Sequence, residues 1–208
     1  STQMHRMGEI ITEQLHIEVK AKVLQNVRFK YACRHCDRTG ITTPVITAPM
    51  PAQPLPGSIA TAGTLAFALV HKFVDGTPLY RLAKAFERAG VPVSRGALAQ
   101  WVIKSSETHL QRIYDALQVR LKAQSLIHGD ETTVQVLKED GKDAASTSFM
   151  WAYRSGVDSD EPIVLLDYQP GRGQIHPQTF LGAYRGILMT DGYQAWRSLE
   201  GATHLGCM

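Results

Sequence analysis

The stretch Leu126–Leu137 constrains the fold of this chain more than any other. It is rich in β-branched and apolar residues and has two adjacent carboxylates, Asp130 and Glu131, near its start, and this pattern predicts a β-strand. A second stretch, Gly186–Tyr193, is a short apolar run that ends at Asp191 and a glycine. We therefore expect Asp191 at the C-terminal end of another strand. Two aspartates at two strand ends are able to share a metal ion if their strands are neighbours.

The pattern of residues 125–208 makes those two strands neighbours. The predicted elements, in chain order, are strands at 127–137, 147–154 and 162–168, a helix at 175–184, a strand at 187–190, a helical segment at 192–199 and a strand at 202–208. Lys138–Lys142 is a charged hairpin turn between the first two strands. Three meandering strands, a crossover helix and a further strand make the ribonuclease H-like order, which brings the first and fourth strands side by side.

Adjacent strands would place Asp130 and Asp191 about 5 Å apart. Two carboxylates at that distance repel each other unless a cation lies between them. Magnesium or manganese suits oxygen ligands and keeps water and substrate phosphate in its shell. Two such ions about 3.5–4 Å apart are able to activate an attacking hydroxyl and to stabilise a leaving oxygen. By strand alternation Glu131 points to the other face of the sheet, and we expect it either to have a structural role or to support the metal ligands without binding the ion.

The first 40 residues predict a β-rich segment. Apolar residues between positions 9 and 32 are spaced mainly by two, which favours strands with one buried face. Cys33 and Cys36 follow, and this Cys-x-x-Cys spacing on a tight turn is how a zinc knuckle presents two thiolates. One pair supplies half of the usual four ligands, and His16 and His35 are further candidates. The alternative interpretation is two free thiols in a turn.

Residues 41–57 contain five prolines and few charges, which predicts an extended linker or a strap on another surface. A helical region, residues 58–124, follows. Its first helix is expected to begin at Ser58 or Thr61 and to stop before an Asp-Gly pair. Its last element is an amphipathic helix over residues 105–124.

Two short helices in this region, joined by a glycine-led turn, match the helix-turn-helix outline. We expect Thr77 to cap the first, with a proline in its first turn, and Ser94 to cap the second, after Gly90. In this motif the second helix enters the major groove of DNA. The candidate DNA-binding residues are the basic side chains on the outer faces: Arg81, Lys84, Arg88, Arg95 and Lys104. The alternative interpretation is an ordinary pair of helices in a bundle.

Composition argues against several classes of protein. The longest mostly apolar run, Ile59–Val70, falls short of the roughly 20 residues that a membrane span needs, so we expect no membrane segment. The N-terminus lacks a signal-peptide pattern and the three cysteines make no even disulfide framework, so a reducing, cytoplasmic location is the expectation. The net charge of +3 does not by itself indicate nucleic acid, although a mildly basic middle precedes an acidic segment.

Motifs along almost the whole chain are similar to those of one family. They are Tyr31–Cys36, Pro78–Arg81, Gly90–Val91, Ser94–Arg95, Trp101–Val102, His128–Thr132, Tyr168–Gly173 and Leu188–Tyr193. Each motif is weak alone, but their joint order is specific. In that order the chain resembles the transposases of bacterial insertion-sequence family sixty-six.

The resemblance implies a ribonuclease H-like catalytic domain with an Asp, Asp, Glu triad, a zinc-binding segment and a helix-turn-helix region. Asp130 matches the first catalytic, metal-binding aspartate and Asp191 the second. The family's glutamate lies on a helix after the fifth strand, and Glu200 comes too early to match it. We therefore expect a truncated fragment without the third carboxylate. The family's zinc segment has an earlier cysteine pair, so Cys33 and Cys36 are expected to form half a zinc site.

The expected fold is mixed α+β, with a β-rich zinc segment in residues 1–40, the linker, the helical region and an incomplete ribonuclease H-like domain in residues 125–208. The expected function is that of a DNA transposase fragment, with DNA strand cleavage and strand transfer that depend on Mg²⁺ or Mn²⁺, and with Zn²⁺ in the first segment. Its expected partners are the element ends, target DNA and further copies of the chain. The alternatives are an inactive remnant that binds DNA or a subunit, and a metal-dependent nuclease of the same fold. Whether this chain alone is an enzyme stays open.

Overall fold

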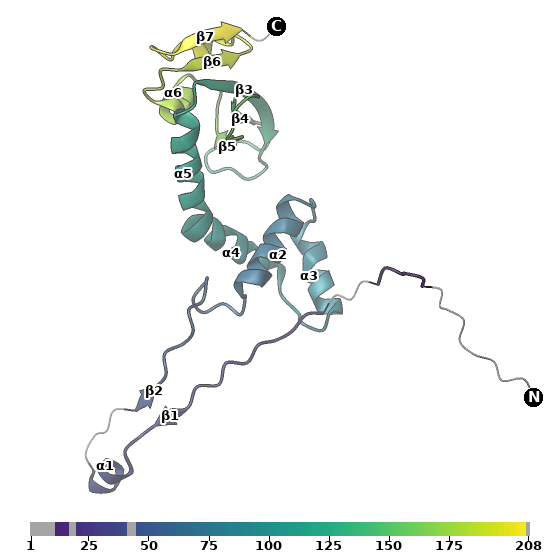
Figure 1. Ribbon diagram of the computed structural model, residues 1–208, viewed down its shortest axis with the longest axis vertical. Helices are drawn as coiled ribbons and strands as arrows, with labels where there is room; N and C mark the ends of the chain where they lie inside the picture. The colour runs from purple at the N-terminus through teal and green to yellow at the C-terminus, as the bar shows by residue number, and fades with distance from the viewer. Residues whose placement is uncertain (1–10, 17–19, 41–44, 207–208) are drawn as a thin grey trace, which may run out of the picture. The chain divides into compact units, whose positions relative to one another are not determined.

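The computed structural model describes residues 11–16, 20–40 and 45–206 (Figure 1). The chain forms two compact units, Ser1–Ser105 and Ser106–Met208. Helices and a mixed sheet are both present, so the predicted α+β class is confirmed. No helix in these described ranges is long and apolar enough to cross a bilayer.

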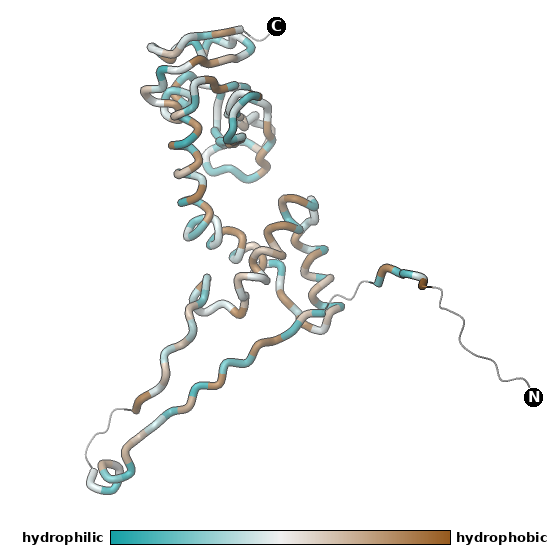
Figure 2. The backbone as a smooth tube through the Cα atoms, in the orientation of Figure 1, coloured by the Kyte–Doolittle hydropathy of each residue, from teal (hydrophilic) through white to brown (hydrophobic). Residues whose placement is uncertain are grey.

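The segment that leads to β1 (Lys30–Tyr31) is exposed and has no regular structure. Before β1, the described residues among 11–29 form neither helix nor strand, and Val23 and Phe29 are 78% and 68% exposed. Apolar and polar positions nevertheless alternate in blocks along this segment (Figure 2). The prediction of strands with one buried face over residues 9–32 is therefore wrong for the described positions before β1, because alternation buries a face only where a partner covers it. β1 itself is a strand, but both of its residues are exposed. The other positions of that prediction lie outside the described residues.

β1 pairs antiparallel with β2 (Ile46–Thr47), and α1 (Arg34–Thr39) lies in the connection between them. Gly40 follows α1 with φ 68°, a left-handed conformation that ends a helix at low cost because glycine has no Cβ. The Cys-x-x-Cys pair, predicted on a tight turn, lies instead at the start of α1.

The described part of the first unit contains three further helices: α2 (Ala62–Phe73), α3 (Leu79–Arg88) and α4 (Arg95–Ser105). The hydroxyl of Thr61 accepts a hydrogen bond of 3.2 Å from the backbone N–H of Thr64. The hydroxyl of Ser94 accepts one of 3.1 Å from the N–H of Ala97. Both predicted caps are therefore confirmed.

Thr77 does not cap α3 as predicted. The helix follows Pro78, whose extended backbone (φ −61°, ψ 140°) occupies the cap position and whose ring makes no side-chain cap hydrogen bond. The prediction places the cap one residue too early, because proline is also tolerated just before a helix, where its missing N–H costs nothing. Gly90, at φ 80°, follows this helix as predicted.

These three helices enclose one apolar core. Its buried residues are Leu55, Ala60, Leu65, Ala68, Leu82, Val93, Leu98 and Trp101. Leu55, which is 3% exposed, belongs to the proline-rich segment. The end of that segment therefore lies on the helices as a strap, while its residues 41–44 lie outside the described residues.

The second unit starts with a π-helical turn, η1 (Ser106–Leu110), followed by α5 (Gln111–Lys122). Its other elements are β3 (Leu126–Gln135), β4 (Thr147–Ser155), β5 (Val164–Gln169), α6 (Ile175–Leu181), β6 (Ile187–Thr190), α7 (Gln194–Arg197) and β7 (Thr203–Gly206). Every element predicted for this region is present. The connection between β3 and β4 is longer than the predicted turn, and α6 ends early because Gly182 (φ 57°, ψ −123°) leaves the helical conformation.

The strands form one five-stranded sheet in the order β5-β4-β3-β6-β7. β3, β4 and β5 are antiparallel neighbours, whereas β6 runs parallel to both β3 and β7. The first and fourth strands are therefore adjacent, as predicted. Their register pairs Leu126 with Ile187, Ile127 with Leu188 and His128 with Met189.

One face of this sheet packs against α5, α6 and α7. The buried cluster includes Ile127, Trp151, Tyr153, Leu165 and Leu188 from the strands, and Leu121, Phe180, Leu181 and Trp196 from the helices. The ring of Tyr153 stacks on that of Phe180 with 3.7 Å between their centroids. On the other face, Val164 and Leu166 of β5 are exposed. The sheet thus has one packed face and one open face.

Candidate functional site

Asp130 and Asp191 lie at the same level of two neighbouring parallel strands. Each follows a member of the last register pair, His128 and Met189, by two residues, and Asp191 is the first residue after β6. Both aspartates are exposed, whereas Thr190 is buried. Strand alternation therefore assigns both carboxylates to the open face of the sheet, and the spacing of neighbouring strands is about 5 Å.

A nearby backbone amide orients each of these aspartates. The Oδ1 atom of Asp130 accepts a hydrogen bond of 2.8 Å from the N–H of Glu131, and that of Asp191 accepts one of 2.9 Å from the N–H of Tyr193. Gly192, at φ 85°, allows the turn that brings this second amide back to Asp191. Two oriented, exposed carboxylates are a donor set that suits a hard divalent cation.

Glu131 is buried on the opposite face, as predicted from strand alternation. Its side chain is 1% exposed. Its Oε2 accepts a hydrogen bond of 2.8 Å from the indole N–H of Trp196, and its Oε1 accepts hydrogen bonds from Nε, at 2.7 Å, and Nη2 of Arg172. Both carboxylate oxygens are therefore occupied by donors of this chain.

Gly129 makes room for the same indole ring. A Cβ at this position would lie 2.7 Å from Cη2 and Cζ3 of Trp196, closer than carbon atoms approach. Trp196 itself is fully buried and makes edge-on contacts with Trp151 and Tyr153. The glycine before Asp130 is therefore a packing requirement of α7 on β3.

Arg172 connects Glu131 to the turn after β6. Its guanidinium lies over the ring of Tyr193, with 3.7 Å to the centroid, and its carbonyl oxygen accepts a hydrogen bond of 2.9 Å from the Tyr193 hydroxyl. The hydrogen bond that Arg172 donates to Glu131, with smaller contributions from the charges of Glu131, Tyr193 and Asp191, raises the pKa of Arg172 above its ordinary value. We call Glu131, Arg172, Tyr193 and Trp196 the Glu131 network.

The two candidate zinc ligands lie at the start of α1. Cys33 directly precedes the helix and is exposed, and Cys36 is half-buried. Hydrogen bonds from the backbone and side chain of Cys36, and from the backbone of His35, lower the pKa of the Cys33 thiol and favour its metal-binding thiolate form. Over the described ranges, no three His, Cys, Asp or Glu side chains cluster in a way that could hold a metal ion.

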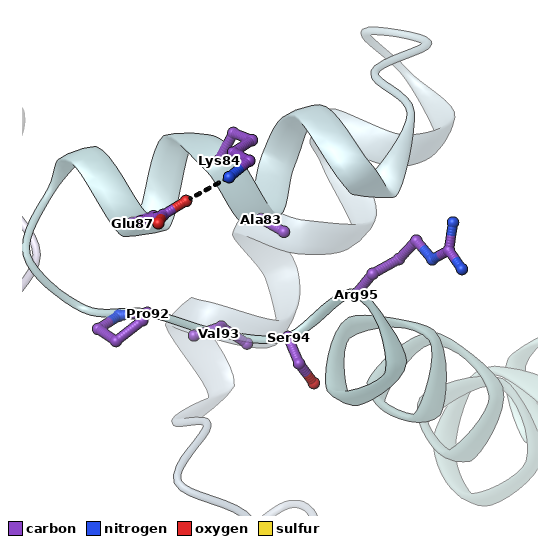
Figure 3. A pocket seen from close by; sticks show the side chains of 7 residues that line it. All are labelled: Ala83, Lys84, Glu87, Pro92, Val93, Ser94 and Arg95. Atoms are coloured by element: carbon purple, nitrogen blue, oxygen red, sulfur yellow. Dashed lines mark hydrogen bonds and ion pairs between the residues drawn. The ribbon is translucent and has the colours of Figure 1, made fainter.

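The five basic residues predicted to bind DNA are all exposed on α3 and α4. Two of them, Lys84 and Arg95, line one shallow hollow of about 350 Å³, together with Glu87 (Figure 3). The Lys84 ammonium is 2.8 Å from a carboxylate oxygen of Glu87, which offsets part of its charge. The Arg95 side chain extends away from that ion pair (Figure 3).

Two family models match this chain. Residues 57–208 match the transposase IS66 family, and residues 1–37 match the zinc-finger binding domain of transposase IS66. The chain belongs to the IS66 transposase family. The resemblance seen in the sequence motifs is therefore confirmed over most of the chain.

Curated relatives of this IS66 family member occur in Sinorhizobium fredii. The uncharacterized protein y4jD is 31% identical over 211 residues, which cover 99% of this chain and 40% of that protein. The uncharacterized protein y4qI is 33% identical over 201 residues, which cover 94% of this chain and 36% of that protein. The chain spans well under half the length of these relatives. No solved structure matches it.

Sequence patterns in this IS66 chain pointed to Asp130 and Asp191 as candidate ligands but not to the contacts around them. Arg172, Tyr193 and Trp196 were not predicted as partners of Glu131. The available signal was that Arg172 stands between two glycines in the motif Tyr168–Gly173, in a loop, where functional side chains are over-represented.

Proposed function

We propose that the sheet of residues 125–208 is the ribonuclease H-like catalytic core of a DNA transposase, and that Asp130 and Asp191 bind Mg²⁺ or Mn²⁺ there. The observation that supports this most is the shared level of the two carboxylates on neighbouring parallel strands. The sheet order, with three antiparallel strands followed by two parallel ones, agrees with the order expected for that fold. Family membership supports the transposase role.

The donor set fits such an ion. When bound, a divalent ion neutralises charge on a phosphate and lowers the pKa of an attacking hydroxyl or water. Asp130 and Asp191 provide oriented oxygens on the open face of the sheet, where a DNA backbone has access. Glu131 is not proposed as a ligand because it is buried on the other face, nor is Glu200, which is exposed in the turn before β7.

The first 124 residues would then position the DNA. In this proposal α3 and α4 form a helix-turn-helix whose five basic residues contact phosphates, and Cys33 and Cys36 provide two thiolates of a zinc site. The zinc-finger match over residues 1–37 supports the second point. We further propose that the protein acts in the cytoplasm as a homo-oligomer, because joining two element ends to a target requires the ends to be held together.

Manganese binding to the 208-residue chain tests the catalytic proposal. We expect Asp130→Ala and Asp191→Ala each to abolish the binding that the parent shows when free Mn²⁺ is measured by electron paramagnetic resonance. The control is Asp158→Ala, which removes an exposed carboxylate from another turn of the same unit and should leave binding unchanged. If both site variants bind Mn²⁺ like the parent, these residues are not its ligands.

A second candidate, DNA binding without chemistry, is favoured by the exposed basic residues of α3 and α4. Arg and Lys contacts to phosphate make affinity fall steeply with salt. A chain that binds DNA in this salt-dependent way but binds no Mn²⁺ would support this candidate over the catalytic one. Affinity that is unchanged between low and moderate salt would argue against DNA as the partner.

A further inference from the structure

Side chains from three segments of the chain donate hydrogen bonds to the backbone of the connection between β5 and α6. The consecutive carbonyl oxygens of Pro170–Arg172 accept hydrogen bonds, in that order, from the ammonium of Lys142, the indole N–H of Trp151 and the hydroxyl of Tyr193. The last two bonds measure 3.3 and 2.9 Å. A connection held at three successive peptide groups presents its one charged side chain, that of Arg172, in a defined place.

From that place Arg172 contacts a neighbour of each candidate metal ligand. Its guanidinium donates to Glu131, the residue that follows Asp130 in β3. The same guanidinium lies over the ring of Tyr193, whose backbone N–H donates to the carboxylate of Asp191. β3 and β6 pair directly only as far as His128 and Met189. Arg172 therefore makes a second link between the two strands, beyond this last pair.

We propose that Arg172 is a positioning residue that keeps Asp130 and Asp191 in the geometry of a shared metal site. This inference rests on the proposed function of those two aspartates. Arg172 acts through Glu131 and Tyr193: its guanidinium bonds to Glu131, which is buried on the face opposite the two aspartates, and it is not proposed as a ligand of the ion. Residues that orient metal ligands in this indirect way typically change metal affinity about 10- to 100-fold when they are mutated.

The direction in which Mn²⁺ affinity changes when Arg172 is removed distinguishes a positioning role from a purely electrostatic one. Arg172 is a cation, and the negative charge of Asp191 contributes to raising its pKa. If charge alone mattered, removing it would strengthen the binding of another cation nearby. Loss of positioning would weaken that binding instead.

A matched control exists in the same unit. Arg120 of α5 donates through Nε, at 3.0 Å, and through Nη2 to Glu161, so it also forms an arginine–glutamate pair with two hydrogen bonds, but its partner lies outside β3 and β6. We expect Arg172→Ala to lower Mn²⁺ affinity at least about 10-fold, and Arg120→Ala to leave it at the parent value. Tyr193→Phe keeps the ring but loses the bond to the Arg172 carbonyl, and serves as a milder variant if Arg172→Ala does not fold. We expect it also to weaken Mn²⁺ binding.

Hydrogen exchange supplies a second readout that needs no metal. The N–H of Tyr193 reports its bond to Asp191, so its exchange should be faster in Arg172→Ala and Tyr193→Phe and unchanged in Arg120→Ala. The inference would be overturned if Arg172→Ala and Tyr193→Phe both kept the exchange rate and the Mn²⁺ affinity of the parent. Tighter Mn²⁺ binding in these variants would also overturn it. In either case the proposed function would still stand. If the parent itself binds no Mn²⁺, it is the proposed function that fails.

Discussion

The indole N–H of Trp196 donates a hydrogen bond of 2.8 Å to Glu131, and the same ring lies directly against Gly129. These two contacts join α7 to β3 at the two residues that flank Asp130. Because side chains alternate along a strand, Asp130 points to the other face and its carboxylate stays out of these contacts. The helix therefore sets the backbone position of Asp130 without occupying its oxygens.

Gly129→Ala should destabilise the second unit. The added Cβ would lie 2.7 Å from the Trp196 ring, which is fully buried and packed edge-on against Trp151 and Tyr153. We expect the free energy of unfolding in urea to fall by about 1–3 kcal/mol. Gly206→Ala in β7 is the control, because nothing lies within 4 Å of a Cβ there. Equal losses in the two variants would contradict the steric explanation.

Glu131→Ala should cost far more stability than Glu161→Ala. The first removes a carboxylate that is 1% exposed and leaves the N–H of Trp196 and the guanidinium of Arg172 without their acceptor, which we expect to cost about 3 kcal/mol. The second removes the exposed partner of Arg120 and should cause no measurable change. Urea unfolding of both variants checks this, and a similar loss in both would show that burial does not decide the outcome.

Ser94→Ala and Thr77→Ala should differ although sequence patterns predict both residues as caps. Ser94 accepts the hydrogen bond from Ala97 and Thr77 does not occupy the cap of α3. We expect Ser94→Ala to destabilise α4 by about 1 kcal/mol and Thr77→Ala to stay within about 0.5 kcal/mol of the parent. Hydrogen exchange of the α3 and α4 amides measures both effects. Faster hydrogen exchange of the α3 amides in Thr77→Ala would contradict this prediction and would indicate that Thr77 does cap α3.

Tyr114 should make the second unit sensitive to alkaline pH. Burial, followed by the charges of Asp167 and Asp115, raises the pKa of Tyr114 to about 12, and its hydroxyl donates to the carbonyl of Leu166 at 3.0 Å. The ordinary tyrosine pKa is about 10. Its contribution to stability is therefore complete below pH ~10 and is lost as the pH rises toward ~12.

Comparison with Tyr114→Phe isolates that contribution. The difference in unfolding free energy between the parent and this variant should be constant below pH ~10 and should shrink above it. Ultraviolet titration of the folded parent should show one late-ionising phenol that the variant lacks. A difference that does not depend on pH would mean that Tyr114 ionises alike in the folded and unfolded chains.

Several features of the fold follow from short-range patterns in the sequence. β6 has the predicted bounds, Ile187–Thr190, because a glycine precedes the apolar run and an Asp-Gly pair follows it. The caps Thr61 and Ser94 are correct because a hydroxyl next to the first turn bonds a helix amide within three residues. The order of strands and crossover helix was enough to predict that β3 and β6 are neighbours, and so to bring Asp130 and Asp191 together.

Tertiary structure decided what covers each face. The alternating pattern over residues 9–32 was as good as that of a real strand, yet the described residues before β1 form no strand and stay exposed. Glu131 shows the opposite case: alternation predicted its direction, but its donors, Arg172 and Trp196, lie 41 and 65 positions away. The direction in which a side chain points depends on the backbone of a few neighbouring residues, so the sequence pattern predicts it. Burial and the choice of a polar partner depend on segments that meet only when the chain has folded.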